Sequence, residues 1–259
     1  MSSQTSPRPD KAVQPDDSLD LREFGAAING VPQVSTRRLF LQLQVFGGCT
    51  HPQKLIEPLK SSLPPLCKGG DLEVVLYQDL NDPRSIGLLF ITEQPDDLVT
   101  EVRSLMTHEP FASLRQRPEL TMIGRTYSSG HEPNLEDWLL VKPRRNVLNP
   151  EFPWAIWYPL RRKSEFYLLP EPDRWKVLFE HAMIGRAYAQ AGYAYDIRLA
   201  CFGLEQKDNE FVLGLVGPEL YPLSRLVQEM RHTQQTAKYI ESLGPFFVGK
   251  VCWQSPLKA

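Results

Sequence analysis

One histidine on the apolar side of a predicted helix is the side chain of this sequence best suited to chemistry. The residue pattern predicts a helix from residue 172 to residue 190. His181 shares one face of this helix with apolar and small residues, namely Val177, Leu178, Ile184, Gly185 and Tyr188. Gly185 lies one turn beyond the imidazole, where a flat ligand can approach the backbone closely. Such an imidazole suits axial ligation of haem iron, and it also suits a hydrogen-bonded core histidine.

A predicted strand just before this helix carries a tyrosine and ends in a cluster of cations. Residues 154–160 are typical of a strand, and alternation places Trp154, Ile156 and Tyr158 on one face. The strand continues into Arg161-Arg162-Lys163. These cations can bind carboxylates through charge-assisted hydrogen bonds, and they are equally typical of a solvated surface.

Further arginines lie before that strand and in the strand that follows the helix. Arg144 and Arg145 precede residue 154, and Arg198 alternates with Ile197 and Leu199 in a predicted strand over 196–204. An arginine between apolar strand residues either faces solvent or is placed to bind an anion. The pattern leaves both alternatives open.

The elements that must position these side chains occur in the same order twice. Each half reads strand, helix, two paired strands, helix and strand. In the first half we expect strands at 39–45, 72–80, 85–92 and 120–127, and helices at 53–62 and 96–106. In the second half we expect strands at 154–160, 196–204, 210–216 and 245–253, and helices at 172–190 and 221–242. Short matches, such as Glu101-Val102-Arg103 with Glu229-Met230-Arg231, favour an internal duplication.

This order predicts an α+β fold built from two tandem ferredoxin-like repeats with antiparallel sheets. The two sheets can pack face to face or close into one barrel. The predicted organisation is a flexible N-terminal arm at 1–35, rich in Ser, Pro, Gln and Asp, and ferredoxin-like halves at 36–128 and 153–254. Residues 129–152 are expected to form an ordered connecting loop.

Composition excludes several functional classes. The chain has 259 residues, 42% of them hydrophobic, so it can bury a substantial core. Its formal net charge of −2 argues against a general nucleic-acid binder or a membrane-surface binder. No apolar run has the length of a membrane span and no signal peptide opens the chain, so we expect a cytoplasmic protein. Scattered free thiols, rather than disulfides or a zinc site, are expected at Cys49, Cys67, Cys201 and Cys252.

Four motifs in the second half together resemble a known superfamily. They are Tyr158-Pro159, the segment from Glu180 to Arg186, Glu229-Met230-Arg231 with Thr236, and the segment from Gly244 to Gly249. In this order they resemble the haem-binding superfamily of chlorite dismutases and coproheme decarboxylases, and most closely its decarboxylase branch. The resemblance implies a dimeric α+β-barrel type of fold, an iron porphyrin (haem b or coproheme) as cofactor, and a homo-oligomeric ring, which we expect to be a pentamer.

The resemblance also implies roles for particular residues. His181 corresponds to the histidine that ligates haem iron, and Tyr158 to the tyrosine that lies beside a propionate and carries a radical. Arg162 falls where the decarboxylases hold a propionate, and Arg231 and Thr236 match a pair that binds carboxylates. Gly185 belongs to the same helix motif, next to the expected ligand.

Two further arginines enter through the same resemblance. Arg144 matches a propionate-binding position in the loop before the strand. Arg198 falls at the position across the haem from the histidine, where most bacterial decarboxylases carry glutamine or histidine and chlorite-degrading members carry arginine. The segment from His181 to Arg198 is also longer than the family pattern, around Ala191 to Tyr195.

The function expected from these residues is peroxide-dependent oxidative decarboxylation of coproheme propionates in haem synthesis, with Tyr158 and Arg198 as catalytic residues. One alternative is a chlorite dismutase-like or peroxidase-like enzyme that uses Arg198 against chlorite or peroxide. Another is a haem-binding or haem-transfer protein without turnover. A structural protein of the same fold is the fourth reading, because related folds host many functions.

Overall fold

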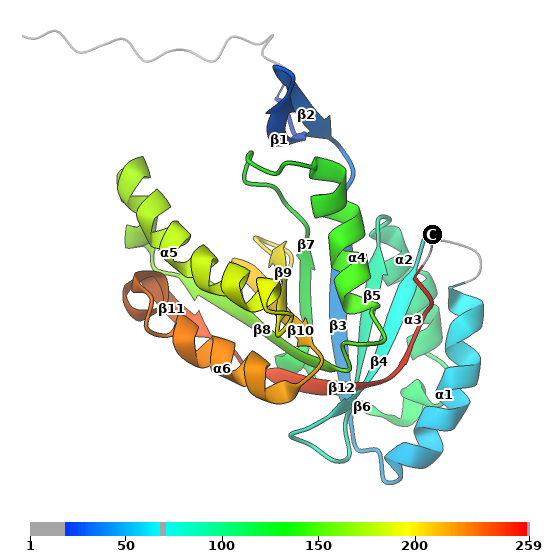
Figure 1. The fold of residues 1–259 in the computed structure, drawn as a ribbon. Helices are drawn as coiled ribbons and strands as arrows, with labels where there is room; N and C mark the ends of the chain where they lie inside the picture. The colour runs from blue at the N-terminus through cyan, green and yellow to red at the C-terminus, as the bar shows by residue number, and fades with distance from the viewer. Residues whose placement is uncertain (1–18, 68–70, 258–259) are drawn as a thin grey trace, which may run out of the picture.

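A closed antiparallel barrel forms the centre of the computed structural model, which describes residues 19–67 and 71–257 (Figure 1). Within these residues one ten-stranded sheet has the strand order β10-β9-β7-β3-β5-β4-β12-β8-β11, with β6 paired to β3. A further ladder joins β10 to β8, so the path returns to its start and the sheet closes. The barrel strands are β3 Phe40–Gly47, β4 Glu73–Asp79, β5 Ile86–Thr92, β7 Met122–Arg125, β8 Trp154–Arg162, β9 Tyr195–Ala200, β10 Phe211–Gly217 and β12 Phe247–Gln254. The flanking strands are β6 Arg115–Gln116 and β11 Ile240–Leu243.

Each half of the barrel is a ferredoxin-like unit, as the sequence predicts. The first half orders its strands β7-β3-β5-β4, and the second orders the corresponding strands β12-β8-β10-β9. The outer face of the first half carries α1 Pro52–Leu66, α2 Asp96–Val99 and α3 Glu101–Met106, and that of the second carries α5 Glu171–Gln190 and α6 Leu220–Met230 (Figure 1). Short 3-10 turns lie at η1 Phe111–Ser113, η2 Pro118–Leu120 and η4 Ser164–Phe166.

Two strand ladders of unequal length join the halves. The two sheets therefore close into one barrel and do not pack face to face. β12 pairs with β4 from Gly249 opposite Asp79 to Gln254 opposite Val75. On the other side, β7 and β9 pair through Arg125 opposite Ala200.

Alternation along the strands separates the barrel interior from the surface beneath the helices. In β8 and β9, Trp157, Ile197 and Leu199 point into the barrel core, which also includes Phe247. The Trp157 ring lies against Gly214 of the neighbouring strand, where any Cβ would clash with it. Alternate residues of the same strands therefore face outward toward α5 and α6.

The segment at 129–152 forms a helix rather than the expected loop. A π-helical turn, η3 Asp137–Val141, continues into α4 Lys142–Val147. Leu135, Leu139 and Leu140 are buried in the same cluster as the barrel interior. Their spacing fits one helical face, and the burial of that face orders the connection.

The predicted arm and the last predicted helix also differ from the structure. Residues 1–18 lie outside the described residues, but β1 Glu23–Ile28 and β2 Val31–Ser35 form a hairpin where we expected a flexible arm. The Glu23 carboxylate anchors this hairpin by accepting hydrogen bonds from the backbone N–H and the hydroxyl of Ser128. The helix expected at 221–242 ends at Met230, and a π-helical turn, η5 Gln235–Tyr239, and strand β11 follow it. Within the described part of the chain, no helix has the length and apolar character that crossing a membrane requires.

Candidate functional site

Tyr158 and Arg198 lie in one row on the outward face of the second half. Leu213 of β10 stands opposite Tyr158 of β8 and also opposite Arg198 of β9. Directly opposed residues in a sheet project to the same face, so the tyrosine and the arginine share one surface. Helix α5 packs on this surface through Ile184 and Tyr188, which contact the cluster that contains Tyr158. The structure therefore brings both predicted catalytic residues to the face that the histidine helix covers.

His181 lies on α5 and is hydrogen-bonded through one ring nitrogen. Its Nδ1 is 3.2 Å from the Oγ1 of Thr233, which is buried in the turn after α6. The Thr233 hydroxyl lies 2.8 Å from the carbonyl oxygen of Met230, its nearest acceptor, and donates to it. The hydroxyl oxygen then accepts from Nδ1–H, which leaves the lone pair on Nε2. A histidine that ligates a metal commonly has this arrangement.

The electrostatic surroundings of His181 keep its imidazole neutral. Burial, and after it the positive charges of Arg162 and Arg198, lower the pKa of His181 to about 4. Asp196 and Glu180 act in the opposite direction. At neutral pH the ring is therefore unprotonated, as ligation of a metal requires. Because their charges affect the pKa of His181, Arg162 and Arg198 lie within electrostatic range of the imidazole.

Tyr158 is buried and keeps its proton. Its ring stacks on Phe246 with centroids 4.6 Å apart. Burial is the main cause that raises the pKa of the Tyr158 hydroxyl, Asp196 raises it further, and Arg231 lowers it. A protonated phenol stacked on a second ring can donate a hydrogen bond or lose a hydrogen atom.

Arg162 presents a buried donor at the end of β8. Its guanidinium lies over the rings of Phe166 and Phe211, at 4.7 and 4.5 Å from their centroids. Its Nε is buried and has no hydrogen-bond acceptor among the described residues. Because a buried charged donor without an acceptor is costly, this nitrogen suits an anionic group from outside the protein.

Arg231 and Thr236 lie in the segment that follows α6. Arg231 is exposed and has no ion pair within residues 19–67 and 71–257, and its charge acts on the pKa of Tyr158. The Oγ1 of Thr236 lies 3.3 Å from that of Thr233, so this hydroxyl adjoins the bond to His181. Sequence reasoning missed Thr233 itself, although its position two residues after Arg231 and three before Thr236 is a signal that could have found it.

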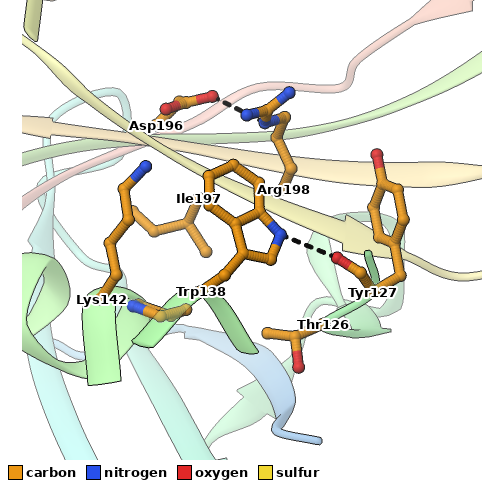
Figure 2. Close-up of a pocket in the computed structure, with 8 residues that line it drawn as sticks. Thr126, Tyr127, Trp138, Lys142, Asp196, Ile197 and Arg198 are labelled. Atoms are coloured by element: carbon orange, nitrogen blue, oxygen red, sulfur yellow. Dashed lines mark hydrogen bonds and ion pairs between the residues drawn. The ribbon is translucent and has the colours of Figure 1, made fainter. Parts of the chain in front are cut away.

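Arg198 is held by two residues that the sequence analysis did not select. Its Nε lies 2.9 Å from the Oδ2 of Asp196, and its Cζ is 4.8 Å from the centroid of the Trp138 ring. These side chains, with Lys142 and Tyr127, line a cavity of about 20 Å³ (Figure 2). Asp196 precedes Arg198 by two residues in one strand, and alternate strand residues project to the same face. This spacing is the sequence signal that could have predicted the ion pair.

Gly185 and Arg144 have other neighbours. A side chain at Gly185 would first meet the Cε of Met230, 3.5 Å away, so the glycine faces the contact between α5 and α6. Arg144 binds three carboxylates of the first half, with Asp71 and Glu73 at 2.8 Å and Glu93 at 3.3 Å. The structure does not bring Arg144 to the surface that His181 covers.

Comparisons with known proteins agree with this architecture. The chlorite dismutase family model matches residues 80–252. A haem-binding protein from Thermus thermophilus has 21% sequence identity and a TM-score of 0.65 over 83% of this chain and 91% of its own. A mutant chlorite dismutase from Candidatus Nitrospira defluvii has 16% identity and a TM-score of 0.64 over 86% of this chain and 94% of its own. The imidazole complex of that organism's chlorite dismutase has 16% identity and a TM-score of 0.63 over 86% and 93%.

Proposed function

Because this chain belongs to the chlorite dismutase family, we propose that it binds an iron porphyrin between α5 and the outward face of β8, β9 and β10. His181 is the axial ligand in this proposal. The observation that carries it is the neutral imidazole, whose Nδ1 is hydrogen-bonded and whose Nε2 has no hydrogen-bond partner among the described residues. The family match and the haem-binding neighbour support haem b or coproheme as the group bound.

The charged side chains around this surface suit a ligand that carries carboxylates. The Nε of Arg162 is buried and has no acceptor among the described residues. Arg231 has no ion pair in the described chain, and the Thr236 hydroxyl, next to that of Thr233, is a further donor. We propose that these three residues bind propionates. Arg144, which already binds three carboxylates, has no part in the proposal.

The proposed reaction is the oxidative decarboxylation of coproheme, with peroxide as oxidant. One propionate, one hydrogen peroxide and one proton give a vinyl group, one carbon dioxide and two waters, so the two electrons that the side chain loses reduce the peroxide. When bound, the iron porphyrin would activate the peroxide, which is the two-electron oxidant. Tyr158 would relay hydrogen in this reaction: the O–H hydrogen that its phenol gives up ends in water formed from the peroxide, and the phenol oxygen then regains a hydrogen atom from a propionate methylene. Its buried, protonated hydroxyl supports this role.

The decisive experiment adds coproheme and peroxide to the purified protein and identifies the porphyrin products by mass. Tyr158→Phe is expected to abolish the loss of carbon dioxide while changing coproheme affinity less than about tenfold, because the ring still stacks on Phe246. Tyr193→Phe, at an exposed tyrosine, is the matched control and is expected to keep turnover. Decarboxylation that persists in Tyr158→Phe contradicts the proposed role.

A second candidate function follows from Arg198. This arginine stands in the same row as Tyr158, where a cation can hold chlorite or assist peroxide cleavage. If that chemistry is the function, Arg198→Gln slows oxygen release or peroxide consumption and Tyr158→Phe has little effect. Porphyrin binding without any turnover in the parent protein would instead favour a haem-binding or haem-transfer protein.

A further inference from the structure

Arg198 is paired with a carboxylate from its own strand. Asp196 and Arg198 are alternate residues of β9 and project to the same face. Their side chains form an ion pair of 2.9 Å and are 33% and 41% exposed, respectively. Figure 2 shows the carboxylate directed at the Nε edge of the guanidinium. The Nε donor of Arg198 is therefore already engaged by Asp196 in the absence of an external anion.

Trp138 makes a second contact with the same guanidinium, a cation–π interaction. The Cζ of Arg198 lies 4.8 Å from the centroid of the indole ring. The indole is itself fixed, because its Nε1 donates a 2.9 Å hydrogen bond to the carbonyl oxygen of Tyr127. Lys142 approaches the same ring, with Nζ 4.3 Å from the centroid. The arginine is therefore bound to a rigid aromatic surface by a cation–π contact and to Asp196 by an ion pair.

The charge of Asp196 also reaches the rest of the proposed site. It raises the pKa of Tyr158 and opposes the fall in the pKa of His181. Without this carboxylate, Arg198 and Lys142 would both still contact the Trp138 ring, and Asp137 would remain as an anion that acts on Lys142. An outside anion and the Asp196 carboxylate thus compete for one guanidinium.

We propose that Asp196 is a positioning residue that holds Arg198 against Trp138 and lowers the affinity of the site for small monovalent anions. It acts as a built-in competitor, so an anion binds Arg198 only at the expense of the ion pair. The proposal deepens the proposed function and rests on it for the location of the anion near the iron. The hold on Arg198 itself does not depend on a bound porphyrin.

The first test uses the full-length protein without porphyrin. Its readout is the ¹⁵N–¹H signal of the Arg198 Nε–H group, which is assigned by its loss in Arg198→Gln. Asp196→Asn is expected to shift this signal and to speed its exchange with water, whereas Asp196→Glu retains much of the protection. Azide should then perturb the signal at a concentration about two- to fivefold lower in Asp196→Asn than in the parent. An unchanged Arg198 signal in Asp196→Asn would overturn the proposal.

The second test adds haem and separates the pairing from a general charge effect. Azide affinity of the ferric protein, followed by absorbance, is expected to rise about two- to fivefold in Asp196→Asn. In the Arg198→Gln background, the same change at Asp196 should have much less effect, because the partner of the carboxylate is absent. Asp173→Asn removes an exposed carboxylate paired with Lys176 and is the matched control.

The outcomes of the two tests distinguish the two proposals. Equal gains in azide affinity with and without Arg198 would reduce Asp196 to a long-range charge and overturn its positioning role. Failure to bind porphyrin would contradict the proposed function alone, since the signal of Arg198 in the porphyrin-free protein still decides whether Asp196 holds it.

Discussion

His181 and Thr233 join the helix of the candidate ligand to the turn after α6. The Nδ1 of the histidine lies 3.2 Å from the hydroxyl oxygen of the threonine. A second bond ties the same two segments, because the backbone N–H of Gln234 donates to the Glu180 carboxylate at 3.0 Å. The orientation of the imidazole therefore depends on residues more than fifty positions away in the chain. A neutral hydroxyl, rather than a carboxylate, is the acceptor for Nδ1–H.

Replacement of Thr233 by valine tests whether this bond orients the ligand. Thr233→Val keeps the branched shape and removes the acceptor, so the Nδ1 tautomer loses its support. Haem affinity, measured by absorbance titration, is expected to fall about 10- to 100-fold. Thr100→Val is the control, because the Thr100 hydroxyl bonds only within the first half, to the carbonyl oxygen of Asp96. Unchanged affinity in Thr233→Val would mean that the bond does not orient the ligand.

The histidines themselves provide the most direct test of the axial ligand. His181→Ala is expected to abolish the five-coordinate ferric absorbance spectrum of the haem-loaded protein. His232→Ala removes an exposed histidine of the segment after α6 and should preserve that spectrum. A normal imidazole-ligated spectrum in His181→Ala would refute the assignment of His181.

Stability of the porphyrin-free protein should depend on pH through His181. Its pKa of about 4 in the folded state is below the usual value of 6.5, so the unfolded chain binds the proton more readily. Stability is then fully present above pH 6.5 and is lost as pH falls toward 4. The loss is expected to be roughly 2–3 kcal/mol by urea unfolding. His181→Gln should remove most of this slope, and His232→Gln should not; equal slopes in His181→Gln and the parent would contradict the prediction.

The buried donor of Arg162 predicts selectivity for porphyrins with more carboxylates. Arg162→Leu is expected to weaken coproheme binding by about tenfold or more, since a charge-assisted bond to a propionate is lost. Arg161→Leu changes the neighbouring residue, which pairs with Glu241, and is the matched control. Fluorescence titrations that show the same affinity for both variants would exclude Arg162 from propionate binding.

Assembly remains a prediction, but the structure changes its physical basis. The family resemblance implies a ring, and two open-edged ferredoxin-like sheets could have formed one by edge pairing, but the barrel closes within one chain through β4–β12 and β7–β9. The exposed aromatic pair Trp175 and Phe179, stacked at 4.7 Å on α5, is now the feature that favours self-association. Static light scattering is expected to give a homo-oligomer, with a pentamer as the expected size. A strict 29.6 kDa monomer at micromolar concentration would refute this.

Features that depend on local periodicity could be predicted from the amino-acid sequence. The helix expected at 172–190 is α5 at Glu171–Gln190, and each of the expected strands begins within about two residues of its expected start. Alternation also correctly predicted that Ile156 and Tyr158 share a face. Burial of one face fixes such patterns within single elements, so no knowledge of distant contacts was required.

Which of these faces meet could not be predicted from the sequence and is set by contacts between distant segments of the folded chain. Periodicity does not specify that the barrel closes or that His181 bonds to Thr233. It also does not specify that Arg198 pairs with Asp196 and lies over the Trp138 ring. Arg144 was predicted to belong to the site, but in the folded chain it binds three carboxylates of the first half and lies away from the candidate site. A charged side chain takes the partner that the folded chain brings within reach, and a one-dimensional pattern does not contain that distance.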